Sequence, residues 1–357
     1  MSTHNPLPIL RWLCAATLAY AFAASSLTSA RAATGLTEIP ATTRNGPVTV
    51  FYPSSSAATQ VQREPFTLSV ADQGTPVRGN GRLIVLSHGT GGNPWVMSDL
   101  AQSLVGAGFV VAIPLHAGDN WHDTSKVGPS SWKLRPLEIS NAIDSIAHDA
   151  RFAPLVDINQ VGMFGFSAGG HTALTLAGGR WSPARQLSHC EAHIADDFVA
   201  CTGGATTLTG GWLDGPKKSI ALAIIRYKLG DAQSYGHTDS RITAIVAAMP
   251  WAADFDLSSL GTPGVALGLV EAGQDIWLRP QWHVAAVRAA CKTCVLVADL
   301  PGASHGAMLA PFPPLLSSRL LPLVADPVGF DRTTEVPRLN QSISAFFEQQ
   351  LHASPKP

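Results

Sequence analysis

Charged side chains are scarce in this sequence. Asp, Glu, Lys and Arg make up 14% of its 357 residues, and the formal net charge is −1. No cluster of Lys or Arg stands out along the chain. Proteins that bind nucleic acid or an anionic membrane surface usually carry such a cluster, so neither partner is indicated. Hydrophobic residues make up 46% of the chain, which is enough for a large core.

Long apolar runs are also missing, apart from one near the start, so no membrane span is predicted. That run, Trp12–Ala24, follows Arg11 and is shorter than the roughly 20 residues that a membrane-spanning helix needs. Ala30-Arg31-Ala32 then supplies a small-residue cleavage site. We expect residues 1–32 to be a signal peptide cleaved after Ala32, and residues 33–357 to form one periplasmic or secreted domain. The alternative is an N-terminal helix that is retained.

Cysteine is rare too, and its positions are informative. Cys14 lies within the predicted signal peptide and follows bulky residues, so a lipid anchor is not predicted. An even number of cysteines in an exported protein indicates disulfides, and the two pairs of near neighbours are the simplest of three connectivities. Two alternatives are a zinc site that adds His189 and His193 to the first pair, and a redox C-x-x-C motif in the second. The four cysteines of the mature chain are Cys190, Cys201, Cys291 and Cys294.

Short apolar runs alternate with segments of helical spacing through most of the chain. Continuous apolarity over four to seven residues indicates strands that are buried on both faces, as in a parallel sheet covered by helices. We therefore predict an α/β fold with a mostly parallel central sheet flanked by helices. Val48–Tyr52 and Phe66–Val70 suggest an antiparallel entry to this sheet. The apolar runs are Leu83–Leu86, Val110–Pro114, Val161–Phe164, Ile242–Ala248, Val265–Val270 and Val295–Leu300, and the segments of helical spacing are 95–105, 137–146, 168–176, 280–290 and 342–351.

One region breaks this alternation. Residues from about 181 to 240 hold the first cysteine pair, a Gly- and Thr-rich stretch at 202–211 and a helical segment at 219–229. We expect them to form a cap insertion over the carboxyl edge of the sheet.

The motif Gly165-Phe166-Ser167-Ala168-Gly169 directly follows an apolar run and opens a segment of helical spacing. A G-x-S-x-G motif in this context is typical of a nucleophile elbow, a sharp turn that exposes the serine. Only small residues fit on either side of such a turn, which accounts for Gly165 and Gly169. The helix N-terminus beneath Ser167 Oγ favours developing negative charge. We predict that Ser167 is a nucleophile.

A second glycine-rich motif, Ser87-His88-Gly89-Thr90-Gly91-Gly92, follows the run that ends at Leu86. In hydrolases such a loop provides one oxyanion donor, and we expect the backbone N–H groups of Thr90 and Ala168 to act together. The alternative is an ordinary glycine-rich turn. His88 is interpreted as structural, because the order of a Ser-acid-His triad places the base near the C-terminus.

His305 is the predicted general base, because it alone among the twelve histidines lies in a loop after the last apolar run. The predicted acid that orients it is Asp275, at the carboxyl end of the preceding strand. Asp254 and Asp256, which follow an earlier strand, are the alternatives.

Four side chains near the predicted strand ends are candidates for substrate contact: Trp95, Phe166, Trp251 and His116. The alternative is that the aromatic ones pack the cap on the sheet. Neither a metal constellation nor a dinucleotide fingerprint is apparent, so no cofactor or metal is expected. The sequence does not indicate an oligomeric state.

Beyond these motifs, the chain resembles bacterial dienelactone-hydrolase-like proteins related to platelet-activating factor acetylhydrolases, members of the α/β-hydrolase superfamily. The resembling segments cover residues 80 to 306 and are 86–92, 108–114, Arg135-Pro-Leu-Glu138, 165–170 and Ala272-Gly-Gln-Asp275. The resemblance implies a serine hydrolase for small or short-acyl esters, including lipid-like ones. Two departures are a serine where dienelactone hydrolases have a cysteine nucleophile, and Ala247–Trp251 where the eukaryotic acetylhydrolases carry their acid.

The expected activity is ester hydrolysis through an acyl-enzyme, with Ser167, His305 and Asp275 as the triad. Two alternatives stay open at this point. An amidase or peptidase would use the same triad, and an exported binding protein would retain the fold without catalysis.

Overall fold

The computed structural model describes residues 1–2, 32–43, 45–311, 323 and 325–352. The predicted signal peptide lies almost entirely outside these residues. The chain divides into two units, Met1–Arg31 and Ala32–Pro357, and every element described below belongs to the second. None of the described helices is both long and apolar enough to cross a bilayer.

A ten-stranded sheet runs through the domain in the order β12-β11-β9-β7-β5-β6-β2-β1-β4-β3. The six strands from β12 to β6 pair in parallel, and β2 joins them antiparallel to β6. The mostly parallel sheet and its antiparallel entry are therefore confirmed. The strands of this sheet are β1 (Ala33–Ile39), β2 (Val48–Ser54), β3 (Thr59–Arg63), β4 (Phe66–Asp72), β5 (Arg82–Ser87), β6 (Val110–Pro114), β7 (Asp157–Phe166), β9 (Ile242–Ala248), β11 (Ala266–Ala272) and β12 (Val295–Leu300).

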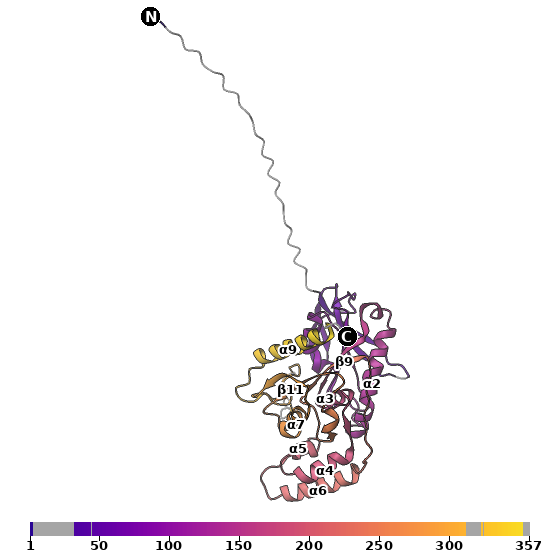
Figure 1. The fold of residues 1–357 in the computed structure, drawn as a ribbon, viewed down its shortest axis with the longest axis vertical. Coiled ribbons are helices and arrows are strands. Elements are labelled where there is room, and N and C mark those ends of the chain that lie inside the picture. The colour runs from indigo at the N-terminus through magenta and orange to yellow at the C-terminus, as the bar shows by residue number, and fades with distance from the viewer. Residues whose placement is uncertain (3–31, 44, 312–322, 324, 353–357) are drawn as a thin grey trace. The chain divides into compact units, whose positions relative to one another are not determined.

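Helices cover both faces of the sheet and bury two apolar clusters against it (Figure 1). Side chains of one strand alternate between the clusters, so that Leu83 faces one and Ile84 the other. α1 and α9 pack on the first face, and α2, α3 and α7 on the second. Outside residues 181–240, the described part of the chain contains the helices α1 (Ser98–Gly106), α2 (Pro129–His148), α3 (Ala168–Leu176), α7 (Val284–Ala290) and α9 (Arg332–His352), with short 3-10 turns η1 (Pro94–Met97), η2 (Ala153–Leu155), η3 (Leu257–Leu260) and η4 (Pro280–Trp282).

The last strand differs from its prediction. β12 was expected to be buried on both faces, but Val295 is 50% exposed and Leu296 is 37% exposed. The reason is topological, because β12 is the edge strand of the sheet. An apolar run alone does not distinguish an edge strand from a central one.

Residues 181–240 contain three helices with a small core of their own, which we call the cap segment. They are α4 (Pro183–His193), α5 (Phe198–Cys201) and α6 (Asp214–Lys228), and Figure 1 shows them together at one end of the domain. The Cys190–Cys201 disulfide lies in that core, beside Phe198 and Ile225. Where the segment begins, the short strand β8 (Arg180–Trp181) pairs with β10 (Phe255–Asp256).

Both predicted disulfides are present. Cys190 bonds to Cys201 and Cys291 bonds to Cys294, each with a Cα–Cα distance of 5.6 Å. The first bond rules out the alternative zinc site, because it consumes both thiolates that would have bound the metal. Among the described residues, no group of three or more His, Cys, Asp or Glu side chains is arranged to hold a metal ion.

Candidate active site

Ser167 lies at the turn between β7 and α3, with φ 57° and ψ −116°. A positive φ is unusual for a residue other than glycine, and it costs on the order of 1–3 kcal/mol unless the surroundings impose it. Here the surroundings do so. Ser167 N–H donates to Ala248 O at 3.0 Å, and Trp251 N–H donates to Ser167 O at 3.2 Å. The turn is therefore held from the neighbouring strand β9.

Glycine is required on both sides of this turn by close backbone contacts. A Cβ atom on Gly165 would collide with the backbone of Gly169, and one on Gly169 would collide with the backbone of Ser87. The second contact presses the start of α3 against the end of β5. The glycine-rich loop that follows β5 is therefore held close to the serine.

His305 and Asp275 complete a hydrogen-bonded relay with Ser167. His305 Nε2 lies 3.0 Å from Ser167 Oγ, and His305 Nδ1 lies 2.6 Å from Asp275 Oδ2. A carboxylate can only accept, so Nδ1 carries the proton and Nε2 accepts from the serine hydroxyl. The three residues follow β7, β11 and β12, whose carboxyl ends meet at one edge of the parallel sheet.

Asp275 is itself oriented by the backbone. Its Oδ1 accepts hydrogen bonds from Trp277 N–H and Leu278 N–H, both at 2.8 Å. The alternative acids lie elsewhere. Asp254 pairs with buried His171 at 3.0 Å, and Asp256 Oδ1 accepts from Ser258 N–H at the start of η3. Of the three candidates, the structure brings Asp275 to His305.

In comparisons with known proteins, no family model and no curated protein matches this chain. What the site can do must be inferred from its own geometry.

The site opens into a cavity of about 730 Å³. Ser167, His305 and both predicted oxyanion residues, Thr90 and Ala168, line it. Within the described part of the chain, neither the Thr90 N–H nor the Ala168 N–H donates a hydrogen bond to another residue. Two such amides beside a serine hydroxyl can stabilise an oxyanion formed there.

Of the four predicted substrate contacts, the structure places two at the cavity. Phe166 and Trp251 line it, whereas Trp95 and His116 are not among its described lining residues. Trp95 packs edge-on against Phe51, with the ring centroids 6.5 Å apart. His116 is fully buried in a separate cluster, described below. Both follow strand ends in sequence, but their side chains pack away from the cavity.

The cap segment supplies a large part of the cavity wall through α5, α6 and the loop between them. It is joined to the domain by polar contacts. Trp251 Nε1–H donates to Gln186 Oε1 at 3.2 Å, and buried Asp197 accepts from His189 at 2.8 Å and lies 3.3 Å from His283 Nε2. Burial would raise the pKa of Asp197, but the two histidines lower it to about 2.

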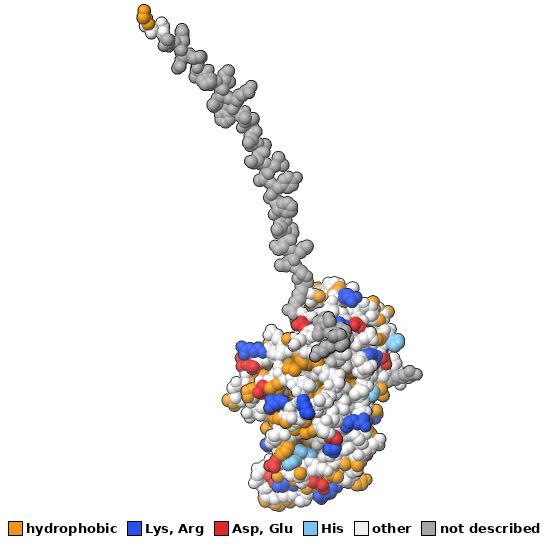
Figure 2. All heavy atoms as spheres, in the orientation of Figure 1, with side chains coloured by type: hydrophobic (Ala, Val, Ile, Leu, Met, Phe, Trp, Pro, Cys, Tyr) orange, Lys and Arg blue, Asp and Glu red, His pale blue; other side chains and the backbone are white. Residues whose placement is uncertain are grey.

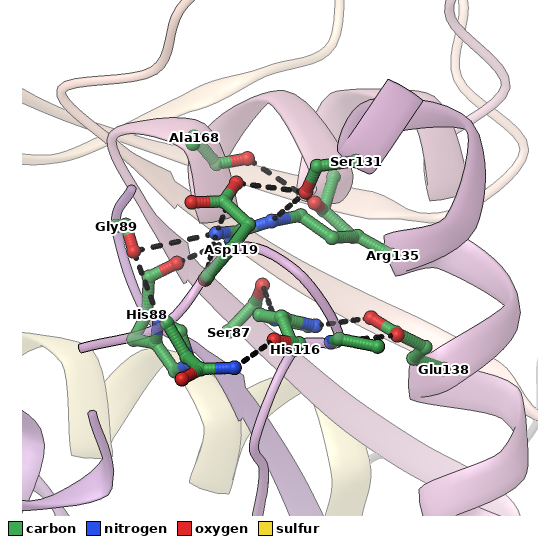
Figure 3. Close-up of polar contacts among 12 residues, drawn as sticks. Ser87, His88, Gly89, His116, Asp119, Ser131, Arg135, Glu138 and Ala168 are labelled. Atoms are coloured by element: carbon green, nitrogen blue, oxygen red, sulfur yellow. Dashed lines mark hydrogen bonds and ion pairs between the residues drawn. The ribbon is translucent and has the colours of Figure 1, made fainter. Parts of the chain in front are cut away.

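A buried arginine, Arg135 of α2, holds the glycine-rich loop in place (Figure 3). Its guanidinium donates to His88 O at 2.5 Å and to Gly89 O at 3.3 Å, and pairs with Asp119 at 2.9 Å. Asp119 in turn accepts from Gly91 N–H at 3.0 Å. The pair thus contacts the loop on both sides of Thr90, and we call it the Arg135–Asp119 clamp.

The charges of the clamp stabilise each other. Burial would raise the pKa of Asp119, but the Arg135 guanidinium and the hydrogen bonds from Gly91 and Ser131 hold it below its usual value. The sequence analysis assigned no role to either residue, although Arg135 lies in a segment that carries the family resemblance. Arg135 contacts residues that lie 16 to 47 positions earlier in the chain. A pattern of neighbouring residues in the sequence cannot predict contacts over such separations.

A second serine–histidine–acid relay lies next to the clamp (Figure 3). His116 Nε2 is 2.8 Å from Ser87 Oγ, and His116 Nδ1 is 2.6 Å from Glu138 Oε2. Burial lowers the pKa of His116 well below the usual value, and the Arg135 charge lowers it further. Burial also raises the pKa of Glu138. Neither Ser87 nor His116 is among the described residues that line the cavity.

Proposed function

We propose that this chain is a serine hydrolase that cleaves carboxylic esters through an acyl-enzyme intermediate. The observation that carries the proposal is the Ser167–His305–Asp275 relay at the wall of a cavity that Thr90 and Ala168 also line, two residues whose N–H groups donate to no other described residue. A serine hydroxyl is weakly nucleophilic unless a base accepts its proton. His305 Nε2 is at hydrogen-bonding distance for that transfer.

In the proposed reaction, Ser167 Oγ attacks the ester carbonyl carbon while His305 Nε2 takes the hydroxyl proton. The carbonyl oxygen becomes an oxyanion that the Thr90 and Ala168 amides stabilise. The intermediate collapses, His305 returns the proton to the departing alcohol, and the acyl group stays on Ser167. Water then repeats the two steps and releases the acid. Asp275 holds His305 in the required tautomer throughout.

We also propose that the protein is exported. Two disulfides support this, because disulfides persist mainly in oxidising compartments. The predicted cleavage after Ala32 agrees with the described structure, in which β1 begins at Ala33.

On the face drawn in Figure 2, basic and acidic side chains are interspersed, which gives no support to a nucleic-acid partner.

The test combines hydrolysis with active-site labelling. The mature protein should hydrolyse p-nitrophenyl esters and should react with a fluorophosphonate probe, and Ser167→Ala should do neither. An unlabelled, inactive wild-type protein would contradict the proposal. Labelling without ester hydrolysis, combined with cleavage of a p-nitroanilide, would favour an amidase instead.

A further inference from the structure

The cavity is much larger than a short acyl group requires. Its volume of about 730 Å³ lies within the range of roughly 300–1,000 Å³ that is usual for ligand sites. If each heavy atom takes about the 30 Å³ of a water molecule, the three heavy atoms of an acetyl group fill on the order of a tenth of it. Most of the wall would then face no substrate atoms.

The wall is apolar away from Ser167. Trp132, Trp251 and Trp277 line it from the body of the domain. Ala221, Ile224 and Ile225 line it from α6. None of the described lining residues is acidic, so the wall offers no carboxylate partner for a cationic group.

Two polar side chains that the cap segment adds to the wall, Gln186 and Lys217, already have hydrogen-bond partners within the protein. Gln186 Oε1 accepts from Trp251 Nε1–H at 3.2 Å. Lys217 Nζ donates to Thr207 O at 2.8 Å and lies 3.5 Å from Asp214. A hydrophobic chain lying between α6 and the sheet would therefore displace few hydrogen bonds.

Two isoleucines at the rim of the cavity are exposed. Ile220 is 62% exposed and Ile224 is 50% exposed, and both line the cavity from successive turns of α6. Exposed helix positions are usually polar. A ligand chain that covers these side chains would bury apolar surface on binding, which is favourable.

We propose that the substrate is an ester with an apolar chain of about eight carbons or more on one side of the ester bond, held between α6 and the sheet. Such a chain would fill roughly a third of the cavity on the scale used above. This inference rests on the proposed ester hydrolysis. It departs from the small esters that the family resemblance implies and specifies a chain length for the lipid-like ones.

Two substrate series test chain length on each side of the ester bond. We would measure kcat/KM for p-nitrophenyl acetate, butyrate and octanoate, and for ethyl, butyl and octyl acetate, all below the concentrations at which they aggregate. At least one series should rise about tenfold or more from its shortest to its longest member, because each buried methylene adds favourable free energy. A decrease in both series would overturn this inference while leaving ester hydrolysis intact. Failure to hydrolyse any ester would instead overturn the proposed function, and this inference with it.

A matched pair of α6 variants tests the binding surface. Ile224→Glu places a charge on the cavity wall, and Tyr227→Glu places one three residues later at a side chain that is 90% exposed and is not among the described lining residues. For the preferred long ester, Ile224→Glu should lower kcat/KM about tenfold or more, with little change for the shortest ester of the same series. Tyr227→Glu should change neither. Equal losses on long and short esters, or equal losses in both variants, would overturn the inference. Thermal melts of both variants check that the helix is retained.

Discussion

Two serine–histidine–acid relays lie near each other in this molecule, and their geometries are almost the same. The serine–histidine and histidine–acid distances are 3.0 and 2.6 Å in the Ser167 relay and 2.8 and 2.6 Å in the Ser87 relay. Hydrogen-bond geometry alone therefore does not distinguish them. Their surroundings do, because Ser167 lines the cavity together with Thr90 and Ala168, whereas Ser87 is fully buried.

The backbone also differs between the two serines. Ser167 occupies a turn with positive φ that exposes its hydroxyl, and Ser87 is the last residue of strand β5. The buried relay joins β5, the loop after β6 and α2, all of which surround the glycine-rich loop. We interpret it as a structural network that satisfies buried polar groups. The following predictions test this distinction.

The largest difference is expected between the two serine-to-alanine variants. Ser167→Ala should lower kcat for ester hydrolysis by on the order of 10⁶-fold, as loss of a triad nucleophile does elsewhere. Ser87→Ala should leave kcat within about tenfold, while the unpaired His116 destabilises the fold by about 1–3 kcal/mol. Steady-state kinetics and denaturant unfolding measure the two effects. A loss in Ser87→Ala comparable to that in Ser167→Ala, in a folded protein, would remove the distinction.

The next largest difference is expected between the acids of the two relays, Asp275 and Glu138, when each is replaced by its amide. Asp275→Asn should lower kcat by on the order of 10⁴-fold, because the amide no longer fixes the working tautomer of His305. Glu138→Gln is the matched control, since it makes the same change in the buried relay. Its kcat should fall by less than about tenfold. If the control loses as much activity as Asp275→Asn, the buried relay takes part in the reaction.

The site could be predicted largely from local sequence, whereas the cavity could not. Ser167 was identifiable because a sharp strand-to-helix turn demands Gly165 and Gly169. His305 and Asp275 followed from the order of the strands, because carboxyl ends of parallel strands share one edge. Trp95 shows the limit of this reasoning, since its position after a strand does not determine which way its side chain packs.

Contacts between residues far apart in the sequence could not be predicted either, because they too depend on how side chains pack in the folded domain. The Arg135–Asp119 clamp joins α2 to two loops, and nothing in the spacing of these residues indicates it. The size of the cavity depends on how α6 is placed relative to the rest of the domain, which is a property of tertiary packing. Fold and catalytic candidates are therefore readable from this chain, and substrate size is not.

The clamp holds the glycine-rich loop that carries Thr90, and it predicts an intermediate effect. Arg135→Lys keeps the charge but cannot donate to His88 O, Gly89 O and Ser131 Oγ together, so the Thr90 amide should lose its position. We expect kcat to fall by about 10²-fold with little change in KM, as for a weakened oxyanion donor. Affinity for a trifluoromethyl ketone, which mimics the oxyanion, should fall in parallel.

Arg241→Lys provides the control for this clamp variant. Arg241 pairs with Asp239 at 2.7 Å and makes no described contact with the glycine-rich loop. The Arg241→Lys variant should keep the wild-type kcat and the wild-type affinity for the trifluoromethyl ketone. If Arg135→Lys lost thermal stability but kept its affinity for the ketone, Arg135 would be structural only and would not position the loop.

The smallest effect is the pH dependence of stability, which arises from the buried relay and from neighbouring His88. Burial holds the pKa of His116 and of neighbouring His88 well below the ordinary value of 6.5. Below pH 6.5 the unfolded chain therefore binds protons that the folded protein does not, and the free energy of unfolding decreases as the pH falls. Each histidine contributes a slope of up to about 1.4 kcal/mol per pH unit. Glu138 acts in the opposite sense, because its raised pKa lets the folded protein take up a proton more readily than the unfolded chain.

Urea unfolding at pH 7.5, 6.5 and 5.5 measures this slope. His116→Gln should unfold more easily at every pH but should show a shallower slope than wild type between pH 6.5 and 5.5. An unchanged slope in His116→Gln would mean that His116 is protonated in the folded protein, so that the buried relay holds a charged histidine rather than a neutral structural one.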